Sequence, residues 1–301
     1  MPRFIILSLL LLCAGFIPAH AGDRDAVPVL RIGLLESHPA TTDPAKIRTI
    51  EQAYEKAIGL PVEIVRFPDP AALIDAQASA RVHYAIHSAL SFATTQVLCD
   101  CITPLRRALG ADGRTGFRSV LVLRPDIDPS DARVAFSGRN SLSGWIIPRE
   151  AVDSGALTVG ELVRAGSVRA AVDRLVVGEA DGVMAWLPEG GANEAAALPE
   201  RLFGGQYAND LEKAGDLRIA WLSDPVYNGP HAGLRSLPDE LVEKLGRFLD
   251  GMPGGQPGLL DILEPYEPGG YGPASEADYR GLERVAKGLR EDAPAITGAT
   301  P

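Results

Sequence analysis

Two serines and a glycine stand where the chain leaves a short apolar segment, in the stretch "NSLSGWIIPRE" that covers residues 140–150. The preceding residues 132–136, "ARVAF", have the pattern of a buried strand. Free amides at the start of a following helix, together with hydroxyl groups, can donate hydrogen bonds to a bound anion. The stretch therefore predicts either an oxyanion site or an ordinary helix cap, built from Asn140, Ser141, Leu142, Ser143 and Gly144.

Pro148 lies inside the helix that is expected to follow this corner. Proline is tolerated near a helix start and disrupts a helix interior, so the helix should begin late or bend there. Gly144 would allow the backbone to approach a ligand closely, since it has no side chain.

Further polar residues are expected at the ends of strands or near the start of a helix. Ser37 follows the first predicted strand, and His87 with Ser88 follow the third. Arg169 lies early in a helix, where its planar guanidinium can bind two oxygens of an anion. The alternatives are a surface loop or helix cap for His87 and Ser88, and a solvent-facing position for Arg169.

The sequence lacks the common motifs of catalysis and cofactor binding. "SLSGW" lacks the first glycine of a Gly-x-Ser-x-Gly elbow, and no Gly-x-x-x-x-Gly-Lys loop occurs. The five histidines show no metal-ligand spacing, and a serine nucleophile here would need His87 as its base. We therefore predict a protein that is not an enzyme and that holds no cofactor or metal.

The elements around these residues alternate between strand and helix. The first part of the chain predicts a strand at 27–37, helices at 43–60 and 69–81, a strand at 61–67, and a strand running into a helix over 82–98. This order is typical of a parallel sheet covered on both faces, in which ligands bind beyond the carboxyl ends of the strands.

A second unit repeats this alternation. It comprises strands at 117–126, 132–136 and 182–186, a helix after Pro148, and a helix that begins near residue 167. The segment 216–226 then crosses back, and helices are expected at 237–252 and 275–291. We predict a first lobe over 22–120, a second lobe over 121–217, and a return to the first lobe over 218–301.

The N-terminus predicts a secretory signal peptide over residues 1–21, cleaved after Ala21. Arg3 precedes an apolar run, and Ala19-His20-Ala21 has the small-x-small pattern of a cleavage site. Lipidation of Cys13 is disfavoured, because Leu12 stands where a small residue is expected. After cleavage Cys99 and Cys101 remain, and an oxidising compartment allows either a local disulfide or an inert thiol pair.

The charge balance argues against strongly anionic macromolecular partners. The chain carries 39 acidic and 29 basic residues, which argues against binding nucleic acid or an anionic membrane surface. A local pocket can still be positive, so a small anionic ligand is compatible with this composition.

Several segments resemble the periplasmic phosphate/phosphite/phosphonate-binding family of ABC importers. They include "LRIGLLES", "RVHYAIHSALSF", "VAFSGRNSLSGWIIPREAV", "VRAAVDRLVVGEADGVMAW" and "IAWLSDPVYNGPHAGLRSLPDELVEKL", in the family's order. The resemblance implies a type II periplasmic-binding fold of two α/β lobes with a ligand cleft between them. It also implies that the corner at 140–144 holds an oxyanion through hydroxyls and amides.

The sequence departs from the family pattern at three places. Leu142 stands where the family usually has threonine, and Val168 where it often has histidine. The third strand begins with His83 in place of aspartate and ends in His87-Ser88-Ala89 in place of Leu-Gly-Pro. The fold is therefore better supported than the ligand.

Two functions follow from the resemblance and its departures. We predict a monomeric periplasmic protein that captures a small oxyanion by lobe closure and hands it to an ABC permease. The alternative is a module of the same fold, with an altered or absent oxyanion site, that docks a sensor kinase or another partner.

Overall fold

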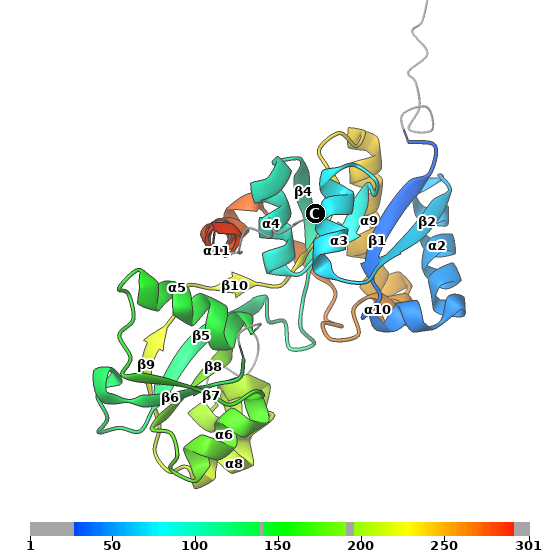
Figure 1. Ribbon diagram of the computed structural model, residues 1–301. Coiled ribbons are helices and arrows are strands. Elements are labelled where there is room, and N and C mark those ends of the chain that lie inside the picture. The colour runs from blue at the N-terminus through cyan, green and yellow to red at the C-terminus, as the bar shows by residue number, and fades with distance from the viewer. Residues whose placement is uncertain (1–26, 139–140, 191–195, 292–301) are drawn as a thin grey trace, which may run out of the picture.

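The computed structural model describes residues 27–138, 141–190 and 196–291. The predicted signal peptide, residues 1–21, and Asn140 lie outside the described residues. Figure 1 shows two α/β lobes joined by extended segments, and the predicted α/β fold class is confirmed. Among the described residues, no helix is long and apolar enough to cross a membrane.

The sheet of the first lobe runs in the order β12-β4-β11-β3-β1-β2. Its first three strands in sequence are parallel, and the other three pair antiparallel. The strands are β1 (Leu30–Leu35), β2 (Val62–Phe67), β3 (Tyr84–Ile86), β4 (Ile102–Ala108), β11 (Pro230–Leu234) and β12 (Tyr271–Pro273).

Asp-Pro pairs begin two helices of this lobe, as the sequence predicts. Asp43 accepts a hydrogen bond from the Ala45 amide at the start of α2 (Pro44–Ile58), and Asp69 accepts one from Ala72 at the start of α3 (Pro70–Ala78). Gly59 ends α2 in the left-handed conformation, with φ 77°. The other helices are η1 (Pro39–Thr42), α4 (Ala89–Cys99), α9 (Asp239–Gly255), α10 (Pro257–Leu263), η5 (Glu276–Tyr279) and α11 (Arg280–Glu291).

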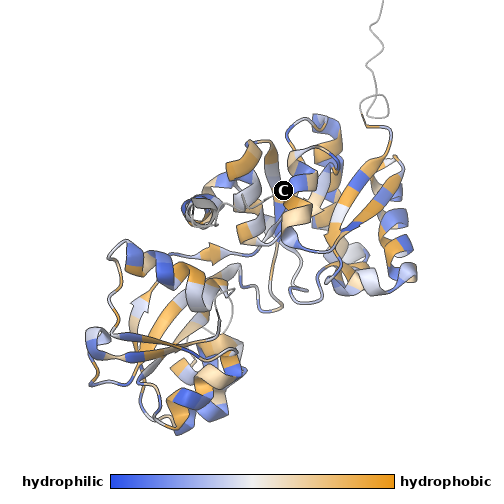
Figure 2. Cartoon of the chain, viewed as in Figure 1, coloured by the Kyte–Doolittle hydropathy of each residue, from blue (hydrophilic) through white to orange (hydrophobic). Residues whose placement is uncertain are grey.

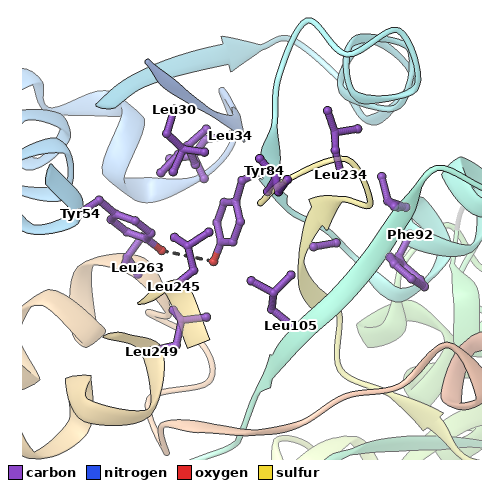
Figure 3. Close-up of a cluster of buried hydrophobic side chains, with 14 of the residues drawn as sticks. Leu30, Leu34, Tyr54, Tyr84, Phe92, Leu105, Leu234, Leu245, Leu249 and Leu263 are labelled. Atoms are coloured by element: carbon purple, nitrogen blue, oxygen red, sulfur yellow. Dashed lines mark hydrogen bonds between the residues drawn. The ribbon is translucent and has the colours of Figure 1, made fainter. Parts of the chain in front are cut away.

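The core of the first lobe is a large apolar cluster with a polar chain through it. Figure 3 shows Leu30, Leu34, Leu245 and Leu249 around the rings of Tyr54 and Tyr84, whose hydroxyls are 3.4 Å apart. Two more contacts continue the chain. The Tyr84 hydroxyl lies 2.5 Å from Nδ1 of His231, whose Nε2 lies 2.5 Å from Glu264. These buried polar groups therefore have partners inside the protein.

The sheet of the second lobe runs in the order β10-β5-β8-β6-β7, and β9 also pairs with β5. Its strands are β5 (Gly116–Leu123), β6 (Arg133–Phe136), β7 (Glu161–Arg164), β8 (Gly182–Glu189), β9 (Arg218–Leu222) and β10 (Val226–Tyr227). The helices of this lobe are η2 (Pro129–Asp131), η3 (Leu142–Ile146), α5 (Ile147–Asp153), α6 (Val168–Val176), α7 (Leu198–Arg201), η4 (Leu202–Gly205) and α8 (Ala208–Lys213).

The helices α5 and α6 cover opposite faces of this sheet. Ala151 of α5 packs with Val134 and Phe136, whereas Val172 of α6 packs with the opposite face at Val183. Figure 1 shows α5 on one side of the sheet and α6 with α8 on the other. Figure 2 shows hydrophobic residues along the strands of both sheets, where these helices cover them.

Two antiparallel crossing segments join the lobes. The amide of Asn228 donates to the carbonyl of Thr115, and its side-chain amide donates to Ala108. The crossings do not lie at the predicted lobe boundaries, 120/121 and 217/218. The second lobe already includes β5, which begins at Gly116, and it still includes β9 and β10, because both strands pair with β5.

Cys99 and Cys101 form a disulfide across Asp100, which resolves the alternative that the sequence left open. Asp100 has φ 46° and ends α4, because its amide donates to the carbonyl of Gln96. The bridge therefore lies at the end of a helix and closes a very short loop.

Candidate functional site

The carboxyl ends of β6 and β7 lie side by side in the second lobe. The two strands are parallel, with Phe136 opposite Arg164, and the Ala165 amide donates to the carbonyl of Phe136. The chain leaves β6 toward η3 and α5, and it leaves β7 toward α6 on the other face of the sheet. Such a place, where the chain departs to opposite faces, is where α/β sheets commonly bind ligands.

A pocket of about 440 Å³ opens at these strand ends. Its lining comes from the ends of β6 and β7 and from the starts of η3 and α6: Ser137, Gly138, Ser141, Arg164, Gly166, Ser167 and Val168. Hydroxyl and backbone groups predominate there, and the one ionisable side chain in this lining is Arg164. The pocket is therefore chemically suited to an anion.

The backbone amides at this corner are only partly occupied. Ser141 donates its amide to the carbonyl of Gly138 at 3.0 Å, and its hydroxyl accepts from the Gly144 amide at 2.9 Å. The amides of Leu142 and Ser143, the first two of the helical segment, have no hydrogen-bond partner among the described residues. The corner thus combines the predicted helix cap with two amides that a ligand can use.

Gly144 is buried between two serine hydroxyls. A Cβ atom at this position would lie 2.6 Å from Oγ of Ser137 and 2.8 Å from Oγ of Ser141. Real Cβ atoms do not approach so closely, so a larger residue here would force the hydroxyl of Ser137 or Ser141 to move. The groups that lie close to Gly144 in the structure are the protein's own hydroxyls.

Leu142 and Ser143 have structural contacts on the other side of the corner. The Leu142 side chain packs against the large apolar cluster, which also contains Ile147 and Val226. The carbonyl of Ser143 accepts a hydrogen bond from Oγ of Ser119 at 2.6 Å. Both contacts fix the backbone of the corner to β5 and to the segment near the crossings.

Pro148 acts as the sequence predicts. Residues Leu142–Ile146 form a π-helical turn, and the α-helix begins only at Ile147, with proline in its first turn. The helix after the corner therefore starts late, because the ring of proline lacks the amide that an interior position needs.

The structure corrects the expectation that His87 faces the cleft. The residue is 4 % exposed, with Nε2 of its ring 2.5 Å from Oε1 of Gln77 and Nδ1 2.8 Å from Oγ of Ser91. Burial lowers the pKa of His87 to about 3, so the ring is neutral. Gln77 in turn donates to the carbonyl of Ala232. Both ring nitrogens have partners within the first lobe, so His87 is not part of the candidate site.

Ser88 and Ser37 lie exposed at strand ends of the first lobe. Ser88 caps α4, because its hydroxyl accepts from the Ser91 amide at 3.1 Å. Ser37 follows β1 in a turn before η1. Neither lines the pocket in the second lobe, so the structure does not bring them together with residues 141–144.

Arg169 does not line the pocket and is a paired surface residue. Its guanidinium lies 2.7 Å from Asp210 and 3.0 Å from Asp173, with the side chain 56 % exposed. The hydrogen bond from Lys213 and the nearby Arg169 lower the pKa of Asp210, so this group of charges is internally satisfied. The solvent-facing alternative for Arg169 is the one observed.

Three residues that line the pocket were not predicted from the sequence: Ser137, Arg164 and Ser167. Ser137 directly follows β6, and Ser167 caps α6 by accepting from the Ala170 amide at 3.1 Å. Arg164 ends β7, a four-residue strand that the sequence did not indicate. A signal existed in "GSVRAAV", where a serine precedes the apolar periodicity of a helix.

A second, larger groove lies between the lobes. Its volume is about 640 Å³, and it runs between α5, the segment 221–227 and α11.

In the parts of the chain that the structure describes, no group of three or more histidine, cysteine or acidic residues is placed to hold a metal ion.

Comparisons with known proteins agree on the fold and the family. A family profile described as "ABC transporter, phosphonate, periplasmic substrate-binding protein" matches residues 42–279. No curated protein sequence matches the chain.

Solved structures match over most of the chain. XAC2383 from Xanthomonas citri, bound to ATP, has a TM-score of 0.59 and 16% identity, covering 88% of this chain and 98% of its own. PhnD1 from Prochlorococcus marinus, in complex with methylphosphonate, has a TM-score of 0.50 and 15% identity, covering 88% of this chain and 99% of its own. At these identities the two structures show a shared fold. Because the family profile spans most of the described residues, the chain belongs to the family of periplasmic substrate-binding proteins of phosphonate ABC transporters.

Proposed function

We propose that the protein captures a small oxyanion of the phosphonate or phosphate class between its lobes and delivers it to the permease of an ABC importer. The observation that carries the proposal is the pocket at the carboxyl ends of β6 and β7. Beside it, the amides of Leu142 and Ser143 have no partner among the described residues, and the start of α6 opens onto it.

Neutral donors are well suited to a ligand that must be released again. Amides at a helix start carry partial positive charge and bind anions without a fixed countercharge. Closure of the lobes would exclude water and strengthen these contacts, because electrostatic interactions grow as the local dielectric constant falls. Opening would restore the water and free the ligand.

The first lobe would supply the other wall of the site. Ser88 and Ser37 are exposed at the ends of β3 and β1, the positions at which parallel strands present side chains to a ligand. We propose that these two hydroxyls meet the ligand when the lobes close about the crossings at Thr115 and Asn228.

The ligands of structural relatives support the class. PhnD1 is described in complex with methylphosphonate, and XAC2383 with ATP and, in another structure, with a chloride ion. All three ligands are anions. The sensor alternative has no observation in its favour.

A thermal-shift screen tests this function. The purified protein is heated with phosphate, phosphite, methylphosphonate, methanesulfonate or acetate, each against sodium chloride of equal ionic strength. A ligand at about 100 times its Kd should stabilise the protein by about 2.7 kcal/mol. If no phosphorus oxyanion raises the melting temperature above the chloride control, the proposed function is wrong.

A further inference from the structure

The guanidinium of Arg164 is an available positive charge at the wall of the pocket. Arg164 is exposed at the end of β7, and it makes no hydrogen bond or ion pair with any described residue. Three other arginines of the second lobe are paired with carboxylates: Arg118 with Glu189, Arg133 with Asp181, and Arg169 with Asp173 and Asp210.

No other cation reaches this pocket from the described residues. Val168, the first residue of α6, contributes an apolar side chain, and the adjacent Arg169 is held by two carboxylates. The remaining lining offers serine hydroxyls and glycine backbone. This remaining lining carries no full positive charge that could balance a second negative charge on a ligand.

We propose that Arg164 determines specificity at this site, by pairing with the second negative charge of a dianionic ligand. The proposal rests on the proposed function. The planar fork of arginine matches two oxygens of a tetrahedral oxyanion, which lysine does not reproduce. The ligand class is then a phosphonate or phosphate dianion in preference to a sulfonate or carboxylate monoanion.

Methylphosphonate and methanesulfonate form a matched ligand pair for the test. Both have a methyl group on a tetrahedral centre with three oxygens, and at about pH 8 the phosphonate is largely dianionic whereas the sulfonate has one charge. Titration calorimetry measures Kd for both ligands with the wild type, Arg164→Gln and Arg164→Lys. Arg201→Gln serves as the control, since Arg201 is also without a partner among the described residues but lines a different pocket.

Loss of a charge-assisted contact should weaken methylphosphonate binding by about 10-fold to 100-fold in Arg164→Gln. Methanesulfonate binding should weaken much less, so the ratio of the two Kd values, which measures the preference for the phosphonate, should fall. The Kd of Arg164→Lys for methylphosphonate should lie between those of the wild type and Arg164→Gln. Arg201→Gln should bind as the wild type does. Because Arg164 is exposed, all variants should melt near the wild-type temperature without ligand.

Three results would overturn the proposal, and they are distinguishable. If the wild type binds and Arg164→Gln binds methylphosphonate equally well, Arg164 has no role and the proposed function stands. If Arg164→Gln weakens both ligands by the same factor, the residue does not discriminate charge. If the wild type binds no anion, the proposed function itself fails.

Discussion

At the scale of single residues, the packing of the corner at 141–144 involves a glycine held between two hydroxyls. A Cβ at Gly144 would overlap Oγ of Ser137 and of Ser141. We predict that Gly144→Ala destabilises the protein by about 1–3 kcal/mol, because overpacking a buried site has this effect. Ligand binding should also weaken, since the amides of Leu142 and Ser143 are displaced with the corner. Urea unfolding and titration calorimetry measure the two effects.

Two further variants test whether the loss of stability comes from crowding at Gly144 or from replacing a glycine by alanine in general. Gly281→Ala, in α11, meets nothing within 4 Å and should leave stability unchanged or raise it by up to about 1 kcal/mol. Adding Ser137→Ala to Gly144→Ala removes the nearer hydroxyl and should recover part of the lost stability. Equal stability of Gly144→Ala and the wild type would show that the corner is not packed as described.

His87 makes the stability of the first lobe sensitive to acid. Its pKa is lowered to about 3 by burial, from an ordinary value near 6.5. Below about pH 6.5 the unfolded chain binds a proton that the native state does not, so stability falls as pH falls, by up to about 1.4 kcal/mol per unit.

Replacement of this histidine should therefore change the pH dependence of stability. The free energy of unfolding should drop less between pH 7 and pH 5 in His87→Gln than in the wild type, by about 2 kcal/mol. Urea titrations at both pH values measure the difference. Identical slopes in the two proteins would mean that His87 is not buried as a neutral ring.

Residue types predicted the corner but not the whole pocket. Serines and a glycine after an apolar segment marked 141–144, because short polar residues at a strand end are visible in sequence. His87 and Arg169 were equally visible, but each also has a partner farther along the chain: Gln77 is 10 residues from His87, and Asp210 is 41 residues from Arg169. Whether such a side chain faces a ligand or the protein depends on tertiary contacts, which spacing does not contain.

At the scale of elements, the sequence predicted the regular alternation and missed the irregular strands. The helices with Asp-Pro starts and the alternating strand at 61–67 were found close to their observed bounds. β4 contains Pro104 and two arginines, and β7 has four residues that are half-buried or exposed. Such strands are specified by pairing with β11 and β6 more than by local pattern.

Arg107 in β4 ties three elements together near the crossings. The residue is 7 % exposed, and its guanidinium donates to the carbonyl of Pro273 and to Asp278 at 2.7 Å and lies 4.2 Å from the ring centre of Tyr227. We predict that Arg107→Met destabilises the protein by about 3–5 kcal/mol, because it leaves a partly buried carboxylate without its cation.

An exposed ion pair provides the control for Arg107→Met. Arg81 and Asp75 are joined on the surface, with side chains 59% and 73% exposed. Arg81→Met should therefore cost less than about 1 kcal/mol in the same urea experiment. Similar losses in both variants would contradict the view that Arg107 organises the region where the lobes meet.

At the scale of the whole molecule, the proposed function requires that the two lobes move about the two crossings. The crossings are joined by hydrogen bonds between Asn228, Thr115 and Ala108, and the Tyr279 hydroxyl donates to the carbonyl of Asn228. If the lobes close about the crossings, these contacts lie near the hinge and can persist during closure. Figure 1 shows β10 between the two lobes.

Closure predicts a change in overall size on binding. Small-angle X-ray scattering should give a smaller radius of gyration when methylphosphonate saturates the protein. Arg164→Gln at the same ligand concentration should show a smaller fraction of the change, and a full change at higher concentration. An unchanged radius at proven saturation would exclude lobe closure as the mechanism of capture.

The most direct measurement is a crystal structure of the protein grown with methylphosphonate. The account predicts the oxyanion at the carboxyl ends of β6 and β7, within hydrogen-bond distance of the Leu142 and Ser143 amides. The competing place is the larger groove between α5 and α11. A phosphonate bound in that groove, with the corner at 141–144 left to solvent, would contradict the central claim.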